Sequence, residues 1–410
     1  MCSSDLVALT RAGATVHLHE LAPHPGGRAR SASTAHGEAL DNGQHILIGA
    51  YQATLDLMRT VGVDPEEVLL RRPLQLCNAR GEGLRLPGGP PWLAFARGVL
   101  TWQGVPWPER LGLLRMAAGW QWRGFRCAPD LTVRDFAADC PPTVWSELIE
   151  PLCVAALNTP ADQASAQVML RVLQDALFLG AGSADLLLPR APLSALLPTP
   201  ALHWLKAHGA TVHMPSRVRA LTRHAEGAWS VDGQPSGGVI LACSPTEAAR
   251  LLDPWAPDWS RQARSIGYQP IATVWLEAGP VNWSGPMIRL SDGPAQFAFD
   301  LGRLGGPPGR YALVASGALE ALGAGTDALC AATLAQWQAQ AAAPGLARLH
   351  AVRVEKRATF ACTPALDRPD GHPLPGLWVA GDYVAGPYPA TLEGAVRAGE
   401  AAARGWLNSN

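Results

Sequence analysis

The sequence predicts an α/β protein with two domains, and three separate segments support this prediction. Near the start, a helix is followed by a strand over residues 15–19 that ends on Glu20. The turn Pro25-Gly-Gly-Arg28 comes shortly afterwards. Near the end, a short apolar strand over 377–380 runs into Gly381-Asp382 and then into a helix rich in small residues. This combination is typical of a Rossmann-like dinucleotide-binding domain.

Length and composition narrow the classes of function. A chain of 410 residues can bury a large core and fits two domains. Its net charge of −1 gives no support for binding nucleic acid. The eight cysteines are scattered without metal-ligand spacing, so we predict no metal site and buried thiols in a reducing cytosol. No apolar run reaches the roughly 18–20 residues of a membrane-spanning helix. We therefore expect a cytoplasmic protein.

The N-terminal segment supplies the first candidate contacts to a dinucleotide. In a βαβ unit of this kind, the acidic residue that ends the second strand binds the adenosine ribose, which makes Glu20 a candidate. Gly26 and Gly27 permit close approach of the backbone, and Arg28 supplies a cation for a pyrophosphate. A first strand and a glycine-rich turn belong before Val7, and the six residues there are too few to supply them. We therefore expect a truncated or mis-assembled start. Alternatively, Glu20 is only a charge at a strand end.

The C-terminal segment supplies the second group of candidates. Asp382, at the end of its strand, is placed to accept hydrogen bonds from ligand hydroxyls. The helix that opens after Pro389 carries small residues, which let a helix or a flat ligand come close. Its N-terminus presents free N–H groups and positive dipole, so Thr391 and Leu392 are candidate contacts together with Gly381. The alternative is an ordinary strand–helix unit with a surface aspartate.

The middle of the chain predicts the rest of both domains. Helix 199–207 and strands at 211–214, 217–221 and 239–243 complete the nucleotide-binding part. Strand-like alternation over 268–316 predicts an antiparallel sheet that floors a substrate site, followed by helix 326–341 and strand 350–356. The predicted dinucleotide-binding domain comprises residues 1–75, 205–255 and 350–410. A discontinuous α+β substrate domain comprises residues 76–204 and 256–349.

Six further motifs occur in a fixed serial order. They are Asp41-Asn-Gly-Gln-His45, Glu150-Pro-Leu-Cys-Val-Ala-Ala-Leu-Asn158, Ser165-Ala-Gln-Val168, Leu186-Leu-Leu-Pro-Arg190, Glu355-Lys-Arg-Ala-Thr-Phe360 and Tyr388-Pro-Ala-Thr-Leu-Glu-Gly394. Together they resemble the squalene-associated FAD-dependent desaturases, the hydroxysqualene dehydroxylase group of the amine oxidase and phytoene desaturase superfamily. The similarity runs from about residue 7 to residue 404 and departs at the missing glycine loop. It implies FAD as cofactor, with the backbone of Val218 at the adenine.

This resemblance also implies a reaction. Reduced flavin would give a hydride to the allylic carbinol carbon of hydroxysqualene, an apolar triterpenoid, and water would leave to form squalene in hopanoid biosynthesis. The reaction needs an apolar tunnel, a proton donor and exclusion of bulk water. His45, Asp41 and Tyr388 are the candidate donors. Alternatively, Asp41 fixes a turn and His45 is a core histidine. Glu355 is interpreted as part of a structural charge cluster at a strand end. The electron donor is unknown.

A region rich in tryptophan and arginine has two interpretations. Residues 87–126 contain Trp92, Trp102, Trp107, Trp120 and Trp122 among Arg97, Arg110, Arg115, Arg123 and Arg126. Tryptophan at a basic surface predicts peripheral contact with the inner face of an anionic membrane. The same residues also fit a helical cap whose aromatic side chains form a core around an apolar pocket.

Three other functions remain open from the sequence. A carotenoid-type desaturase would use the same fold in the oxidative direction, and product analysis separates it from a dehydroxylase. An amine oxidase is less well supported, because no aromatic pair flanks the flavin helix apart from Tyr383 and Tyr388. A non-catalytic protein is the third, since a chain without the glycine loop would hold little FAD. An absorbance spectrum tests that third alternative.

Overall fold

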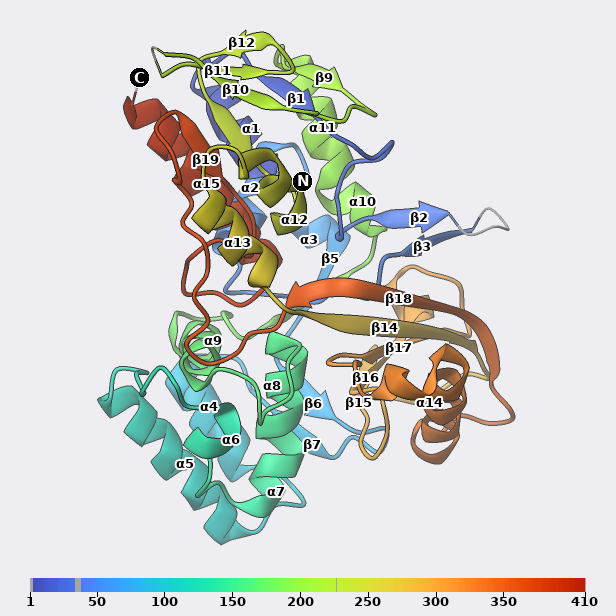
Figure 1. Ribbon diagram of the computed structural model, residues 1–410. Helices are drawn as coiled ribbons and strands as arrows, with labels where there is room; N and C mark the ends of the chain where they lie inside the picture. Colours follow the sequence, from blue (N-terminus) through green and yellow to red (C-terminus); the bar gives the residue numbers. More distant parts are fainter. Residues whose placement is uncertain (1–2, 34–37, 226, 410) are drawn as a thin grey trace.

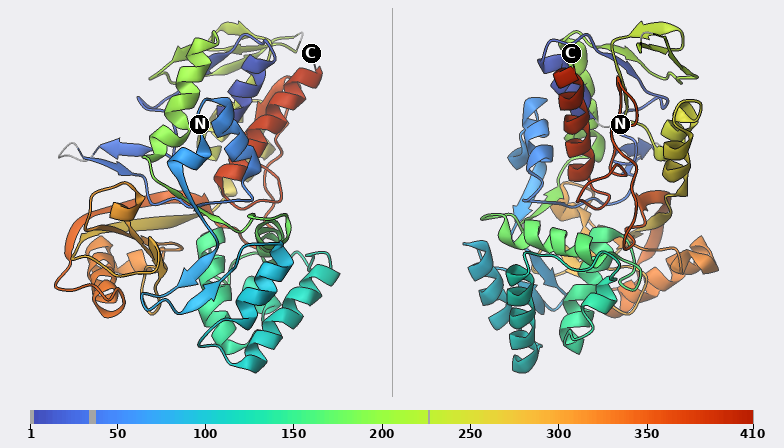
Figure 2. Two further views of the ribbon diagram at one scale, coloured as in Figure 1. Left: turned by 180° about the vertical axis from the view of Figure 1, so that it is seen from behind. Right: turned by 60° about the vertical axis from the view of Figure 1, so that its left-hand side comes forward.

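The computed structural model describes residues 3–33, 38–225 and 227–409. Figure 1 shows two halves, with the long strands β14 (Tyr268–Glu277) and β18 (Arg348–Phe360) running between them. One half holds both marked chain ends, together with helices α1 (Ser3–Arg11) and α15 (Leu392–Ser409). The other half holds a group of helices around α5 (Trp107–Trp122). Figure 2 shows the same division from two further sides.

Two parallel strand pairs form the sheet part of the first half. β1 (His17–His19) pairs with β9 (Thr211–His213), and β13 (Val239–Leu241) pairs with β19 (Leu377–Val379). Within the described residues the two pairs are separate sheets. All four strands fall inside predicted strand segments, so those predictions are confirmed with shorter bounds.

The strand predicted to begin over 217–221 begins only at the last of these residues. Strand β10 (Leu221–Arg223) begins at the last predicted residue and forms an antiparallel sheet with β11 (Trp229–Val231) and β12 (Gln234–Ser236). The backbone N–H groups of Arg219 and Ala220 donate instead to the Asp232 carboxylate, each at 2.9 Å. The Asp232 side chain therefore satisfies these two N–H groups, so they need no hydrogen bonds from a neighbouring strand.

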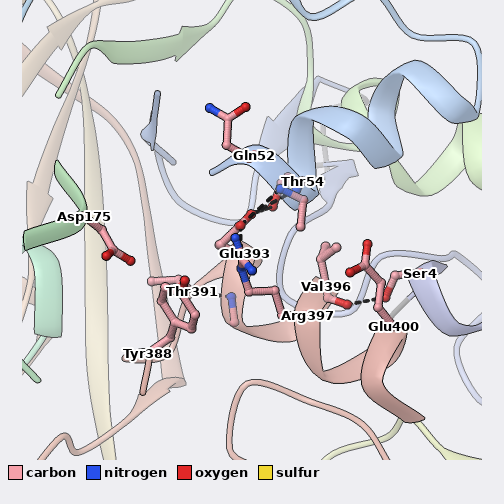
Figure 3. A network of polar contacts seen from close by, with 12 residues as sticks. Ser4, Gln52, Thr54, Asp175, Tyr388, Thr391, Glu393, Val396, Arg397 and Glu400 are labelled. Atoms are coloured by element: carbon pink, nitrogen blue, oxygen red, sulfur yellow. Dashed lines mark hydrogen bonds and ion pairs between the residues drawn. The ribbon is translucent and has the colours of Figure 1, made fainter. Parts of the chain in front are cut away.

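Four helices pack together beside the parallel strands. They are α1, α2 (Gln52–Thr60), α11 (Pro198–Ala207) and α15, and they share a core that contains Val7, Leu57, Leu205 and Val396. The Ser4 hydroxyl donates to the Val396 carbonyl at 2.8 Å, which ties the first helix to the last (Figure 3). The small residues of α15 explain this close packing, because helices lacking large side chains approach one another closely.

A five-stranded antiparallel sheet confirms the prediction for residues 268–316. Its order is β15 (Met287–Arg289), β16 (Phe297–Asp300), β17 (Arg310–Ala315), β14 and β18. Alternate residues of β14 point to opposite faces. Ala272, Val274 and Leu276 belong to a core shared with helix α14 (Thr326–Gln340). Ile271 and Thr273 face a cavity on the other side.

Strand β18 corrects the interpretation of Glu355 as a residue at a strand end. The strand continues to Phe360, and Glu355 lies within it opposite Ile271 of β14. The placement of three elements also differs from the predicted partition of the chain. Helices α11 and α13 (Pro257–Ser265) lie with the first half, whereas β18 lies in the antiparallel sheet (Figure 1).

The tryptophan-rich region forms helices α4 (Pro91–Leu100) and α5. Trp102 and Trp120 are buried in the core of the helical half. By contrast, Trp92, Trp107 and Trp122 are 61%, 59% and 91% exposed. The core interpretation therefore holds for two of the five tryptophans. In the described ranges, no helix is both long enough and apolar enough to cross a membrane.

The remaining elements are short and connect these parts. The helices among them are α3 (Pro65–Val68), α6 (Val133–Phe136), α7 (Pro142–Val144), α8 (Glu150–Leu157), α9 (Ala166–Phe178), α10 (Leu193–Leu196) and α12 (Pro245–Leu252). The strands are β2 (Ser31–Ser33), β3 (Ala39–Asp41), β4 (Leu47–Ile48), β5 (Leu69–Arg72), β6 (Gln75–Cys77), β7 (Gly83–Arg85) and β8 (Leu186–Pro189).

Candidate functional site

A cavity of about 640 Å³ is lined by residues from both halves of the molecule. One part of its wall is apolar and comes from α8, α9, β6, β8, the antiparallel sheet and nearby loops. Its apolar residues include Leu74, Leu76, Leu152, Leu173, Leu177, Leu186, Ile271, Met287, Phe297, Phe299, Val314 and Phe360. The other part is polar and comes from residues 26–29, 42–45, 380–383 and 388–392. Such a wall suits a ligand with one polar and one apolar portion.

The turn at Gly26 and Gly27 forms one edge of the polar part. Both residues have positive φ angles, of 109° and 57°. A Cβ atom on Gly26 would lie 2.9 Å from the Ala29 carbonyl oxygen and 2.9 Å from a ring carbon of Pro198. No residue with a side chain fits there without movement of its neighbours. The turn therefore presents backbone atoms without side chains to the cavity.

Arg28 and Asp382 connect this turn to the C-terminal strand. The guanidinium of Arg28 contacts the Asp382 carboxylate at 2.6 Å and donates to the Ala358 carbonyl at 2.7 Å. The Asp382 side chain is 9% exposed, whereas that of Arg28 is 42% exposed. Two residues predicted to bind different parts of one cofactor therefore form an ion pair at the cavity wall. Their charges can orient a ligand with phosphate and hydroxyl groups.

Two helices begin at the cavity. Ser3 of α1 and Leu392 of α15 both line it. At α15, the Thr391 hydroxyl accepts the N–H of Gly394 at 3.0 Å, which satisfies one of the free groups of the first turn. The remaining N–H groups and the positive end of the helix dipole favour an electron-rich ligand at this wall.

Two buried polar atoms of the wall have no hydrogen-bond partner among the described residues. They are the Tyr383 hydroxyl and the Thr273 hydroxyl. Burial raises the pKa of Tyr383 well above its ordinary value, so its hydroxyl stays neutral. An unsatisfied buried hydroxyl costs about 1–3 kcal/mol. Both residues line the cavity, where a bound ligand is the available partner for these hydroxyls. Together with the bare glycine turn, they fit a flat polar cofactor.

Tyr388 lies between two guanidinium groups. Arg171 of α9 donates to the tyrosine hydroxyl oxygen at 3.0 Å, and its Cζ lies 4.8 Å from the ring centre. The Cζ of Arg397 lies 5.3 Å from the same ring. Burial and the Asp175 carboxylate raise the pKa of Tyr388, and the two arginines oppose that rise. Figure 3 shows Asp175 and Arg397 on either side of the tyrosine.

Glu393 holds the segment that follows Tyr388 in place. Its side chain is 1% exposed and accepts from the backbone N–H groups of Ala53 and Thr54 at 3.1 and 2.9 Å. It also accepts from the Thr54 hydroxyl at 2.8 Å and pairs with Arg397 at 2.8 Å (Figure 3). These are N–H groups of the first turn of α2. A residue of α15 therefore caps α2.

His45 also faces the cavity, through the loop before β4. Its Nδ1 lies 3.0 Å from the Gly43 carbonyl oxygen, so this nitrogen carries the proton. Burial lowers the pKa of His45, and the hydrogen bond to Gly43 only partly opposes this. His45 is therefore a neutral imidazole at neutral pH. As a neutral group it is a weak proton donor.

Nine of the twelve predicted site residues line the cavity. They are Gly26, Gly27, Arg28, His45, Gly381, Asp382, Tyr388, Thr391 and Leu392. The other three lie elsewhere. Asp41 accepts from the Ser31 hydroxyl at 2.6 Å and from the Leu193 N–H at 3.0 Å, so it joins the β2–β3 hairpin to the start of α10.

Glu20 and Val218 lie outside the cavity wall as well. Glu20 accepts the N–H of Ala22 through its side chain at 2.8 Å. The Val218 carbonyl accepts from Arg250 at 2.7 Å. Their contacts to an adenosine remain predictions.

The structure adds residues that the sequence did not single out as site residues. Arg353, Glu355 and Arg357 alternate along β18 and all line the cavity. Asn42 donates from its side chain to Glu355 at 3.1 Å. The sequence signal for these three residues was the two-residue spacing of their charges, because alternate residues of a strand share a face. Arg171 and Asp175 gave no such signal, since arginine and aspartate four residues apart are common on exposed helices.

Comparison with known proteins finds a matching family and several relatives of this chain. The profile of the family described as "Flavin containing amine oxidoreductase" matches residues 7–405. The hydroxysqualene dehydroxylase of Rhodopseudomonas palustris is 30% identical over 97% of this chain and 94% of its own length. The enzyme of the same name from Sinorhizobium fredii is 27% identical over 98% and 94%.

Solved structures with the same fold are more distant in sequence. An oxidoreductase from Methanosarcina mazei superposes with a TM-score of 0.72 at 14% identity, over 97% of this chain and 96% of that one. Cyclohexylamine oxidase from Brevibacterium oxydans superposes with a TM-score of 0.68 at 15% identity, over 99% and 96%. At these identities the likeness concerns the fold.

Proposed function

The chain belongs to the flavin-containing amine oxidoreductase family, and on this premise we propose that it reduces hydroxysqualene to squalene with FAD. The observation that carries the proposal is the two-part cavity, whose polar wall suits a flavin cofactor and whose apolar wall suits a long hydrocarbon. Two hydroxysqualene dehydroxylases align with nearly the whole chain, which supports the same substrate.

FAD is the cofactor, and it supplies the two electrons as a hydride when reduced. We propose that the Gly26–Gly27 turn and Arg28 hold its pyrophosphate, and that Asp382 holds hydroxyls of its sugar-alcohol chain. The start of α15 would face the ring system. Glu20 and Val218 would contact the adenosine at the carboxyl ends of a Rossmann-like arrangement that includes β1, β9, β13 and β19.

The chain's own side chains have three tasks in this reaction. The aliphatic and aromatic wall holds the hydrocarbon and excludes bulk water. The carbinol C–O bond breaks while a C–H bond forms at the same carbon. The departing hydroxyl needs one proton to leave as water, and a donor must therefore stand in the cavity.

We propose Tyr388 as this donor. Its oxygen already accepts from Arg171, so its own O–H proton is free to be given to another oxygen. The guanidinium groups of Arg171 and Arg397 stabilise the phenolate that remains. His45 is the second candidate, and its lowered pKa makes it the weaker one. Asp41 is engaged with Ser31 and Leu193 outside the cavity wall.

Product analysis tests the proposal against the carotenoid-type desaturase. The FAD-loaded protein is reduced anaerobically and mixed with hydroxysqualene, and the oxidised protein is mixed with phytoene in parallel. We expect squalene in the first mixture and unchanged phytoene in the second. Desaturated phytoene together with unchanged hydroxysqualene would establish the oxidative function instead.

A further inference from the structure

Helices α4 and α5 carry large apolar side chains on the surface. Trp92 and Leu100 of α4 are 61% and 38% exposed, and Trp107, Leu111 and Trp122 of α5 are 59%, 45% and 91% exposed. In the described part of the chain, the tryptophans that are more than half exposed all lie on these two helices. Figure 1 places them at the end of the molecule opposite to β12.

The exposed residues of α5 form one stripe. Trp107, Leu111, Arg115 and Trp122 fall within an arc of about 80° around the helix axis. The buried residues of the same helix, which include Leu113 and Trp120, lie on the opposite side. The inner face of α5 is therefore apolar and packs in the core, whereas its outer stripe is exposed in the described part of the chain.

Arg110 joins the stripe of α5 to the end of α4. Its guanidinium lies 4.7 Å from the Trp107 ring centre and donates to the Leu100 carbonyl at 2.7 Å. Leu100 and Trp107 are thus neighbours on one surface. Trp92 stands two turns before Leu100 on a similar side of α4. We call the surface formed by Trp92, Leu100, Trp107, Leu111 and Trp122 the α4–α5 face.

The segment that carries the α4–α5 face is positively charged. Residues 91–126 contain five arginines and one acidic residue, Glu109. Glu109 is already engaged with the Thr143 hydroxyl at 3.0 Å and backbone N–H at 2.9 Å. Among the described residues, no ion pair involves Arg97, Arg115 or Arg126. Exposed tryptophan beside unpaired arginine matches the interface of an anionic bilayer.

A small pocket at the start of α4 shares part of its wall with the main cavity. It measures about 30 Å³, is lined by Pro91 and Ala94 of α4, and shares Leu74, Leu177 and Ala184 with the cavity wall. Trp92 directly follows Pro91. Leu179, two residues after Leu177, is 58% exposed. Three shared residues therefore stand between the small pocket and the cavity, near the start of α4 and the end of α9.

We propose that the α4–α5 face docks on the surface of an anionic phospholipid bilayer, and that the apolar substrate enters the cavity from the bilayer through a passage that opens at the small pocket. The identity of the substrate rests on the proposed function, whereas the docking does not. A face of this kind could also join two copies of the chain, and the experiment separates these outcomes.

Vesicle co-sedimentation tests the docking. The purified protein is mixed with phosphatidylcholine vesicles that contain or lack phosphatidylglycerol, without substrate. We expect binding to the anionic vesicles that weakens with salt. Replacing Trp92, Trp107 and Trp122 together by serine should weaken it by ~10-fold or more, because buried aromatic area drives interfacial binding. Arg97→Gln with Arg115→Gln should weaken it about fivefold per arginine.

The matched control is a triple serine variant at Leu319, Leu346 and Leu349. These residues are 60%, 82% and 49% exposed and lie outside the α4–α5 face. This variant should bind vesicles like the unchanged protein. Equal loss in both triple variants, or no vesicle binding by the unchanged protein, would overturn the proposal. Sedimentation velocity measures whether the unchanged protein forms dimers. Dimers that dissociate in the tryptophan variant would show that the face is an interface between copies instead.

A separate variant tests the proposed passage. A Cβ atom on Gly88, which lines the small pocket, would meet nothing within 4 Å, so Gly88→Trp is compatible with the fold. It should retain vesicle binding and lower kcat/KM for hydroxysqualene at least ~10-fold. Unchanged kcat/KM would exclude this passage. Vesicle binding without turnover of hydroxysqualene would refute the proposed function and leave the docking face intact.

Discussion

At the scale of single residues, the chemistry depends on how Tyr388 and His45 are held. Both face the cavity, but their surroundings shift their pKa values in opposite directions. Tyr388 keeps its proton because burial and Asp175 raise its pKa. His45 loses its proton because burial lowers its pKa. The two candidates are therefore distinguishable by pH as well as by substitution.

Replacing Tyr388 by phenylalanine should slow squalene formation by roughly 10²–10⁴-fold, which is the usual contribution of a general acid. The ring and its packing between the two arginines are retained, so FAD affinity should change little. His45→Gln is the matched variant and should slow the step by less than about threefold. Anaerobic single-turnover measurements give both rates. A large effect of His45→Gln with a small effect of Tyr388→Phe would reverse the assignment.

The pH dependence follows from the directions of the two pKa shifts. The acidic form of Tyr388 is present at every pH below its ordinary value of about 10. The acidic form of His45 is present only below its ordinary value of about 6.5, because its pKa is lowered. If Tyr388 is the donor, the single-turnover rate is flat from weakly acidic to weakly alkaline pH. A rate that rises as the pH falls below about 6.5 would point to His45.

Asp382 should contribute to FAD binding, through its own oxygens and by orienting Arg28. Asp382→Ala removes a charged hydrogen-bond acceptor, and we expect a loss of about 1–3 kcal/mol in FAD affinity. Fluorescence titration of the cofactor-free protein with FAD measures this. Melting of the cofactor-free variant serves as the control, since loss of the ion pair with Arg28 also affects the fold. FAD affinity equal to that of the unchanged protein would leave Asp382 a purely structural residue.

At the scale of elements, much of the nucleotide-binding half could be predicted because its signals are local. Glu20 and the two glycines lie within a few positions of one another, and near the other end of the chain strand β19 is followed closely by the helix rich in small residues. The position of Asp175 in the cavity wall could not be predicted in this way, and for Glu355 the only local signal was the spacing of charges along β18. Each depends on which face of α9 or β18 meets the other half. Asp41 illustrates the converse, because the sequence made it a candidate proton donor, whereas its side chain accepts the Leu193 N–H at the start of α10.

The contact between α15 and α2 allows a prediction about stability. Glu393 accepts three hydrogen bonds from the first turn of α2 while it pairs with Arg397. Glu393→Ala leaves buried N–H groups without partners, so the free energy of unfolding should fall by about 1–3 kcal/mol. Denaturant unfolding measures this. Glu400→Ala, which removes a partly exposed pair with Arg404, should cost less than about 0.5 kcal/mol. Equal costs would show that Glu393 does not act as a cap.

At the scale of the whole molecule, the order of several motifs carried more information than any one of them. Residues that line one cavity come from positions as distant as 26 and 392. The antiparallel sheet was predicted from alternation between glycine and proline breaks, although both faces of β16 and β17 are buried and burial of both faces weakens that signal. The exposed and buried tryptophans of α4 and α5 were not separable beforehand, because tryptophan suits a core and an interface alike.

The central claim is that the reduced protein transfers a hydride to a triterpene carbinol carbon. Anaerobic single turnover tests it most directly. FAD-loaded protein is reduced, freed of excess reductant and mixed with hydroxysqualene, while flavin absorbance and squalene are followed together. We predict one squalene formed for each flavin reoxidised, at the same rate. Flavin that reoxidises without squalene, or flavin that stays reduced in the presence of hydroxysqualene, would contradict the claim.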